Sequence, residues 1–315
     1  MQRNLRIVFF GTPDFAVGIL KTLVENNYNI VGVITAADKP AGRGQKLQES
    51  AVKQYALSKN LTILQPTNLK SEDFLNDLKA LNSNLQIIVA FRMLPKVIWQ
   101  LPKFGTFNLH ASLLPQYRGA APINWAIING DKITGVTTFF IEEKIDTGEI
   151  ILQEEMPIEP NDTAGTLHDK LMNLGSKVTL ETVKLIENDK VLTIPQTTNK
   201  LKEAPKIYTT TCQINWNDSL KNIHNFIRGL SPYPAAWTIL HHNNQEIKVK
   251  IFKSIPEISA HSLKNGTIKV SNKTIKVAVQ DGFLMVEELQ LAGKNKMNIS
   301  NLLNGYKFSE NAHFI

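Results

Sequence analysis

The chain has 315 residues, 43% hydrophobic and 20% charged, a composition typical of a folded globular protein with room for two domains. Its longest apolar runs, such as 87–91, are too short to span a bilayer, and the N-terminus lacks the core and cleavage site of a signal peptide. A single cysteine, Cys212, excludes an internal disulfide and a cysteine-based metal site. We therefore expect a cytoplasmic protein.

The net charge of +7 is unevenly distributed along the chain. Residues 201–315 carry 14 Lys/Arg against 8 Asp/Glu, or +6, whereas residues 1–200 carry 21 against 20, or +1. A basic second part indicates contact with a polyanion such as nucleic acid. The alternative is a lysine-rich surface that serves solubility alone, and charge does not decide between the two.

The first 200 residues alternate short apolar strands with helices, a pattern that predicts a parallel sheet covered on both faces. Ligands of such sheets bind beyond the carboxyl ends of the strands. A helix is also expected to begin near Pro13, and serines are placed to cap the next two helices. The expected strands are 6–10, 30–34, 85–90 and 107–110, and the expected later helices are 50–58 and 71–81.

The pattern weakens between residues 188 and 211, where prolines, threonines and lysines indicate a linker. An amphipathic helix is expected at 219–230, followed by short alternating strands with Asn/Gly/Asp turns, which indicate a small barrel or sandwich. The chain is thus predicted to contain a catalytic domain (1–188), a basic linker (189–211) and a C-terminal domain (212–315). The expected C-terminal strands are 237–240, 247–251, 266–270, 274–279 and 283–291.

Two glycine-containing loops fail the tests for known nucleotide motifs. In Gly11-Thr-Pro-Asp14 a proline stands where a dinucleotide turn needs its second glycine. The loop 41–46, Ala-Gly-Arg-Gly-Gln-Lys, has no Gly-Lys-Ser/Thr and is not a P-loop. It is either a mobile surface turn or a loop through which Arg43 and Lys46 reach phosphates.

The most informative residues are Asn108 and His110 in the predicted strand 107–110, followed by Asp146 in a later turn. Alternation along a strand points Asn108 and His110 to the same side. An amide donor beside an imidazole can stabilise an oxyanion and move a proton, which is what acyl transfer without a covalent enzyme intermediate requires. A lone strand histidine is most often structural, but the neighbouring amide and carboxylate favour catalysis. Nothing in the sequence supplies three or four ligands at metal spacing.

With these residues in view, the chain resembles the methionyl-tRNA formyltransferase family over essentially its whole length. The resemblance implies a Rossmann-like formyltransferase domain, a basic linker and a C-terminal β-barrel of the oligonucleotide-binding (OB) type. The matching segments are 6–15, 39–47, 108–122, 134–136, 146–148, 292–294 and 303–305.

Carried over by position, the resemblance assigns catalysis to Asn108, His110 and Asp146, with 10-formyltetrahydrofolate as formyl donor and no metal. The α-amine of methionyl-initiator-tRNA would be the acceptor, and the protein would be a monomer. Asp146 would orient His110 and favour its charged form. The residues implied to contact the folate are Ile88, Arg92, Met93, Ser112, Leu113, Leu114 and Pro115, and those implied to contact tRNA are Arg43, Lys46 and Lys206.

The chain departs from the family pattern at three places. Arg92 stands where glycine is usual, the turn 144–149 reads Lys-Ile-Asp-Thr-Gly-Glu, and Gln116 replaces an arginine.

Three other interpretations remain: a formyltransferase or hydrolase acting on a small substrate, a tRNA-binding protein without catalysis, and a dinucleotide-dependent oxidoreductase. The basic loop and basic second part disfavour the first, the three catalytic positions disfavour the second, and the glycine pattern disfavours the third.

Overall fold

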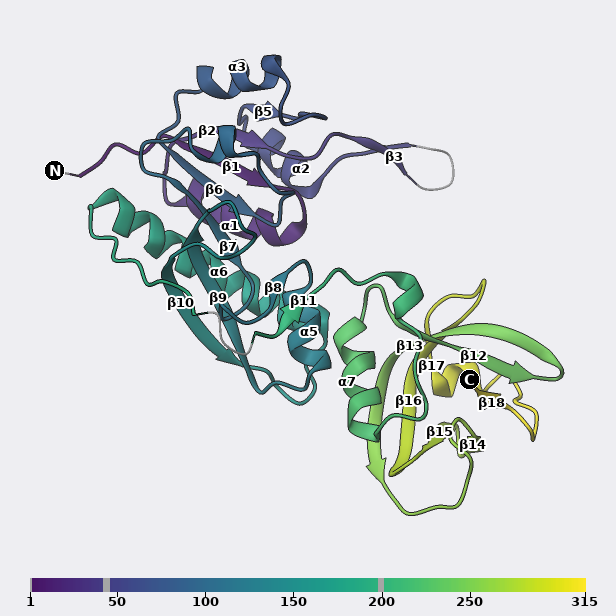
Figure 1. Ribbon diagram of the computed structural model, residues 1–315. Coiled ribbons are helices and arrows are strands. Elements are labelled where there is room, and N and C mark those ends of the chain that lie inside the picture. The colour runs from purple at the N-terminus through teal and green to yellow at the C-terminus, as the bar shows by residue number, and fades with distance from the viewer. Residues whose placement is uncertain (1, 42–45, 198–200) are drawn as a thin grey trace. The chain divides into compact units, whose positions relative to one another are not determined.

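The computed structural model describes residues 2–41, 46–197 and 201–315 and divides into two compact units (Figure 1). Unit 1 comprises 1–119, 134–156 and 168–203, and unit 2 comprises 120–133, 157–167 and 204–315. Within the described part, no helix combines the length and the apolar character needed to cross a membrane.

Unit 1 is built on a seven-stranded sheet in the order β10-β9-β7-β6-β1-β2-β5. The five strands from β7 to β5 are parallel, whereas β9 runs antiparallel to β7. The expected α/β architecture is confirmed, and the sheet is mixed rather than wholly parallel. The strands are β1 (Ile7–Gly11), β2 (Ile30–Ile34), β5 (Ile63–Leu64), β6 (Leu85–Val89), β7 (Thr106–His110), β9 (Ile133–Phe140) and β10 (Ile150–Pro157).

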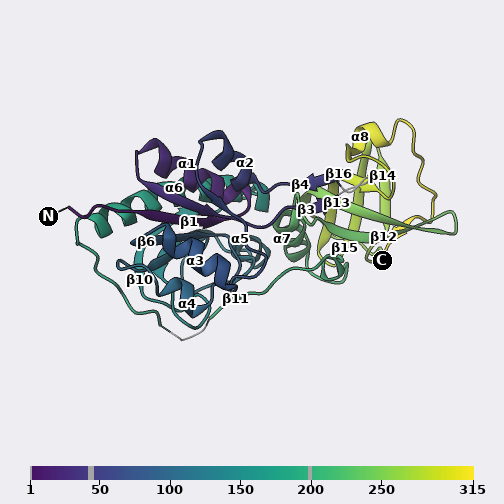
Figure 2. The same cartoon turned by 90° about the horizontal axis from the view of Figure 1, so that it is seen from above.

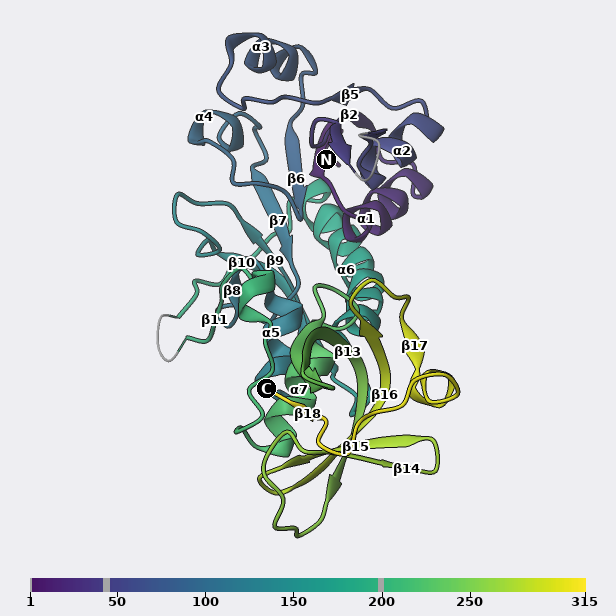
Figure 3. The ribbon, with the colours of Figure 1, turned by 90° about the vertical axis from the view of Figure 1, so that its right-hand side faces the viewer.

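Helices cover both faces of this sheet (Figures 2 and 3). On one face α3 and α4 pack their apolar side chains on Val8, Phe10 and Ile88 of the central strands. On the other face lie α1, α2 and α6, and the short β3–β4 hairpin extends from the same unit (Figure 1). The other elements of unit 1 are α1 (Asp14–Glu25), β3 (Lys39–Ala41), β4 (Lys46–Gln48), α2 (Ala51–Ser58), α3 (Glu72–Ala80), α4 (Lys96–Trp99) and β8 (Arg118–Gly119). The elements α6 (Ala164–Glu187) and β11 (Glu203–Ala204) cross the division between the units, and α5 (Pro122–Ile128) belongs to unit 2.

Unit 2 is an antiparallel half-barrel, as the alternating pattern predicted. Its sheet runs β14-β15-β16-β13-β12-β18, with β17 paired to β16. The elements are η1 (Thr209–Thr211), α7 (Leu220–Leu230), β12 (Ala236–His242), β13 (Gln245–Ile258), β14 (Ile268–Ser271), β15 (Thr274–Val279), β16 (Gly282–Leu291), β17 (Met297–Asn298), α8 (Ile299–Leu302) and β18 (His313–Phe314).

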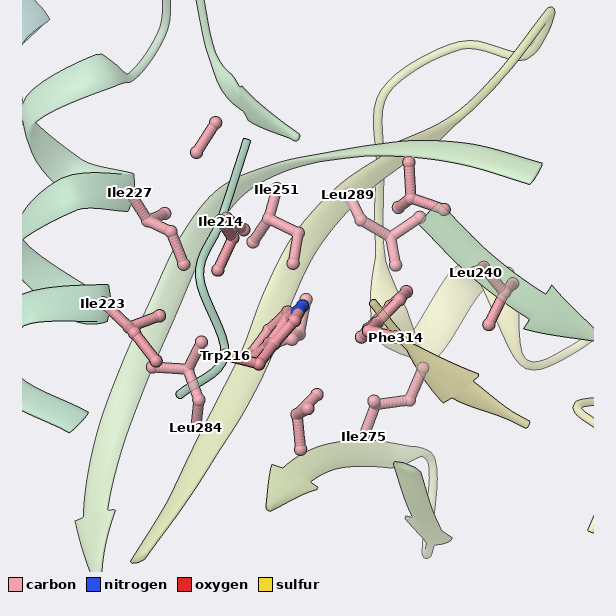
Figure 4. Close-up of a cluster of buried hydrophobic side chains, with 14 of the residues drawn as sticks. Ile214, Trp216, Ile223, Ile227, Leu240, Ile251, Ile275, Leu284, Leu289 and Phe314 are labelled. Atoms are coloured by element: carbon pink, nitrogen blue, oxygen red, sulfur yellow. The ribbon is translucent and has the colours of Figure 1, made fainter. Parts of the chain in front are cut away.

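The core of unit 2 gathers between the curved sheet and α7 (Figure 4). Ile223 and Ile227 point from α7 into this core, where the rings of Trp216 and Phe314 stack with centroids 5.4 Å apart. The Trp216 indole N–H donates to the Thr238 hydroxyl at 2.9 Å, so its one polar atom is satisfied inside an apolar cluster. The amphipathic helix expected at 219–230 is confirmed, with Ser219 as its N-cap.

His224 makes the stability of unit 2 sensitive to acid. Its ring is largely buried beside Ser254, and this burial, with a smaller contribution from the Arg228 cation, lowers the pKa of His224 to about 4 from 6.5. Between pH 6.5 and 4 the unfolded chain therefore binds a proton at this ring that the folded chain does not. The contribution of the neutral ring to the free energy of unfolding is therefore fully present above pH 6.5. It is lost progressively as the pH falls from 6.5 to 4.

The free energy of unfolding decreases as the pH is lowered from 6.5 to 4.5. We predict that His224→Gln makes this decrease smaller by about 2 kcal/mol, since glutamine does not titrate. Denaturant titrations at several pH values, run on the variant and the unaltered protein, measure this difference. Equal slopes for the two proteins would contradict the assignment.

Candidate active site

His110 is the last residue of β7, at the carboxyl end of a central strand of the unit 1 sheet. Its ring is buried, with 7% of its surface exposed, and its Nε2 lies 2.8 Å from the carbonyl oxygen of Tyr117. Because a carbonyl oxygen only accepts, Nε2 carries the hydrogen and donates it. In the neutral ring, the lone pair therefore belongs to Nδ1.

Asp146 lies on the Nδ1 side of this ring, in the turn between β9 and β10. Its Oδ2 is 3.9 Å from His110 Nδ1 and accepts a hydrogen bond of 2.9 Å from the backbone N–H of Gly119. The separation from Nδ1 exceeds a hydrogen bond but lies within the range of an ion pair. A protonated His110 would thus have an acceptor beside each ring nitrogen, with the carboxylate supplying the opposite charge.

Asn108 precedes His110 by two residues in β7, so the two side chains share one face of the sheet. The Asn108 Oδ1 atom is buried and has no hydrogen-bond partner among the described residues. Asn108 as a whole is half-buried. A buried polar atom without a partner is costly, and it suits a position where a ligand supplies the missing partner.

The loop that follows His110 is fixed by one buried hydroxyl. Thr137 Oγ1 on β9 donates to the Ser112 carbonyl at 2.6 Å and accepts from the Leu114 N–H at 3.1 Å. The amide of Gln153 on β10 reinforces this joint by donating to Thr137 Oγ1 and to the Leu114 carbonyl, both at 2.9 Å. Leu113 and Pro115 are half-buried, and the Ser112 hydroxyl donates to the Gln116 carbonyl at 2.7 Å. The predicted folate-contacting loop is therefore rigidly tied to β9 and β10.

The other predicted folate residues lie at and beyond the carboxyl end of β6. Ile88 is buried within the strand, whereas Met93 is 73% exposed. Arg92, which replaces the usual glycine, is exposed and donates to the Thr67 carbonyl at 2.9 Å and to the Pro66 carbonyl. Its guanidinium is therefore engaged by backbone of its own unit.

Three basic residues are predicted to contact tRNA: Arg43, Lys46 and Lys206. Arg43 lies outside the described residues, and Lys46 is described only as the first residue of β4. Lys206 is exposed, with its ammonium 5.3 Å from the centre of the Tyr208 ring. The structure therefore brings together Asn108, His110 and Asp146, whereas the assignment of tRNA contacts to these three basic residues stays a prediction.

Sequence reasoning missed several residues that hold the site together. Tyr117 contacts His110 through its backbone carbonyl, which no side-chain pattern can reveal. Both Tyr117 (φ +63°) and Asp146 (φ +54°) adopt the left-handed conformation that non-glycine residues rarely visit. Such conformations concentrate at functional sites, where the surroundings hold them in place.

The comparisons with known proteins identify the family of the chain. A family model described as formyl transferase matches residues 5–183, and one described as formyl transferase, C-terminal domain, matches 206–307. The methionyl-tRNA formyltransferase of Flavobacterium johnsoniae is 60% identical over 99% of both chains, and that of Parabacteroides distasonis is 55% identical over 97% of both. The chain belongs to the methionyl-tRNA formyltransferase family.

Solved structures of low sequence identity share the fold. A sugar 3N-formyl transferase superposes with a TM-score of 0.64 at 24% identity, covering 93% of this chain and 100% of its own. Glycinamide ribonucleotide transformylase 1 from Symbiobacterium toebii covers 62% of this chain and 92% of its own, with a TM-score of 0.52 at 19% identity. Membership of the family confirms the resemblance seen in the motifs.

Gly148 lets the Asp146 turn lie directly against β9. A methyl group at this position would lie 1.7 Å from the carbonyl oxygen of Phe140. This oxygen belongs to the backbone, so it cannot move without a shift of the chain. We predict that Gly148→Ala lowers the free energy of unfolding by about 2 kcal/mol or more, because the turn must move.

Chemical denaturation measures this effect. Gly305→Ala is the matched control, because nothing lies within 4 Å of a methyl group there. A Gly148→Ala protein as stable as the control would show that the turn is not packed as described.

Proposed function

We propose that the protein transfers the formyl group of 10-formyltetrahydrofolate to the α-amine of methionyl-initiator-tRNA, as a monomer in the cytoplasm. Membership of the family supports this reaction. The observation that carries it is the unpartnered Asn108 amide beside His110, whose ring lies between the Tyr117 carbonyl and the Asp146 carboxylate.

In this reaction the donor supplies an activated formyl carbon, and the α-amine of the aminoacyl ester attacks it. A carbon–nitrogen bond to the amine forms, the bond from the formyl carbon to N10 of the folate breaks, and one proton passes from the amine to N10. The formyl oxygen carries negative charge between these events. Asn108 would donate its amide N–H to that oxygen, and one such donor contributes on the order of 3 kcal/mol to transition-state stabilisation.

His110 would provide the second donor and the route for the proton. Its Nε2–H is held by the Tyr117 carbonyl, so Nδ1 is the nitrogen that gains and loses the proton, on the side where Asp146 Oδ2 lies 3.9 Å away. The Tyr117 carbonyl would keep the ring oriented, and the carboxylate would balance its positive charge. No covalent enzyme intermediate is required, because the attacking amine is already a nucleophile.

The folate would lie against the loops that border these residues. Ser112, Leu113, Leu114 and Pro115 would contact it from the loop fixed by Thr137, and Ile88, Arg92 and Met93 from the end of β6. The turn Lys144–Asp146 would close its pterin side. The unpartnered polar group of Asn108 and the rigid, partly apolar loop fit a ring system carrying a reactive formyl group.

The tRNA would meet the basic part of the chain through Arg43, Lys46 and Lys206 and the lysines of unit 2. Residues 201–315 carry the excess charge of +6, although Lys253, Lys276 and Lys296 are each paired with a glutamate. Phosphate contacts would therefore fall to the other basic residues, and such contacts give affinity rather than base specificity.

The experiment that tests this function measures transfer of labelled formyl from 10-formyltetrahydrofolate to charged initiator tRNA. Uncharged initiator tRNA and charged elongator methionine tRNA are the controls. We expect label only on the charged initiator. Folate turnover without labelled tRNA would replace the proposal with a hydrolase or a small-substrate transferase, and tRNA binding without turnover would replace it with a binding protein.

We predict that Asn108→Ala and Asp146→Ala each lower kcat at least about a hundredfold, because each removes a group proposed to act on the transition state. Single-turnover formylation measures the loss, and circular dichroism checks that the fold is intact. Near-normal turnover of either folded variant would refute its catalytic role.

A further inference from the structure

The chain segment that follows α6 returns to the turn that carries Asp146. Ile194 forms a backbone bridge with Ile150 at the start of β10, and Thr193 donates to the carboxylate of Glu149. Gln196 then reaches the turn itself, with its side chain half-buried. Its Nε2 donates to the carbonyl oxygens of Asp146 at 3.0 Å and Gly148 at 2.7 Å.

The other end of the Gln196 amide holds the loop that carries Tyr117 and Gly119. Its Oε1 accepts from Arg118 Nη2 at 2.7 Å and Nε at 3.2 Å. Arg118 stands between Tyr117, whose carbonyl accepts from His110, and Gly119, whose N–H donates to Asp146 Oδ2. All the hydrogen-bonding capacity of one amide is therefore used to join the two loops on either side of the His110 ring.

The four hydrogen bonds of the Gln196 amide matter because the position of Asp146 depends on the conformation of its turn. Asp146 has a φ of +54°, which a non-glycine residue keeps only when its surroundings hold it. The Gln196 amide bonds the carbonyls of Asp146 and of Gly148, and so holds the turn on both sides of Thr147. Since Asp146 Oδ2 stands 3.9 Å from His110 Nδ1, a small movement of the turn would change that contact substantially.

The segment makes a second connection to the same loop. The Lys202 N–H donates to the side-chain oxygen of Gln116 at 2.8 Å, and the Tyr117 N–H donates to the Lys202 carbonyl at 2.6 Å. The stretch expected to be a linker thus contacts the backbone groups that orient both His110 and Asp146.

We propose that Gln196 is a positioning residue for formyl transfer, which fixes the Asp146–Gly148 turn against the Tyr117–Gly119 loop. The inference rests on the proposed function of His110 and Asp146. Gln196 touches neither substrate nor His110; it acts through Asp146, and its loss lowers turnover by displacing that carboxylate.

Two substitutions separate the two ends of the amide. Gln196→Leu removes all four hydrogen bonds, whereas Gln196→Glu keeps an acceptor for Arg118 but places a carboxylate against the two turn carbonyls. We expect both variants to lower kcat at least about tenfold, since small misplacements of a reacting group are costly, with the KM for tRNA and folate changed less than about threefold. Gln290→Leu is the matched control, because it removes a comparable 2.8 Å bond from a glutamine amide to the Lys294 carbonyl in unit 2.

A double-mutant cycle with Asp146→Asn distinguishes positioning from general support of the fold. If Gln196 acts through Asp146, then Gln196→Leu lowers the residual kcat of Asp146→Asn by less than about threefold. A residue that merely supports the fold would cause the same loss in both backgrounds, together with a lower melting temperature.

Wild-type kcat in both Gln196 variants, or an equal loss in the Asp146→Asn background, would overturn the proposal. Failure of the underlying function is recognised separately, because Asp146→Asn alone would then retain normal turnover. The control Gln290→Leu is expected to keep the wild-type kcat.

Discussion

The hydrogen bond from His110 Nε2 to the carbonyl of Tyr117 is the interaction on which the rest of the site depends. It fixes which ring nitrogen carries the hydrogen in the neutral state and turns Nδ1 toward Asp146. Without it the imidazole could rotate or change tautomer, and the carboxylate would face a different atom. The proposed reaction needs Nδ1 to be the nitrogen that exchanges a proton. The Tyr117 carbonyl oxygen determines this, because it accepts the hydrogen of Nε2.

The surrounding structure serves to keep that oxygen and that carboxylate in place. Thr137 and Gln153 tie the loop after His110 to the antiparallel strands β9 and β10, and Gln196 joins that loop to the Asp146 turn. The antiparallel pair β9 and β10 continues the sheet past β7 and carries the Asp146 turn between its two strands. Because β9 runs antiparallel to β7, its last residue, Phe140, pairs with Phe107, so the turn leaves the sheet beside the start of β7. Within this turn, Asp146 still comes within 3.9 Å of His110 at the end of β7.

Much of this arrangement could be predicted from the sequence. Alternation placed Asn108 and His110 on one side of a strand, and the rule for parallel sheets placed that strand's end at the site. The contacts that orient these groups could not be predicted. Tyr117 acts through its backbone, Gln196 lies in a proline- and threonine-containing stretch with no periodicity, and the direction of β9 depends on packing rather than on local pattern. Local signals locate the candidate side chains, whereas long-range hydrogen bonds orient them.

The most direct test of this account is histidine-selective nitrogen-15 NMR of the protein, with His110→Gln used to assign the signal. The account predicts that neutral His110 is the Nε2–H tautomer, with its lone pair on Nδ1. It also predicts that Asp146→Asn leaves this tautomer unchanged, because the Tyr117 carbonyl sets it. A neutral ring protonated on Nδ1 and hydrogen-bonded to Asp146 would contradict the account, because the orienting group would then be the carboxylate and not the backbone.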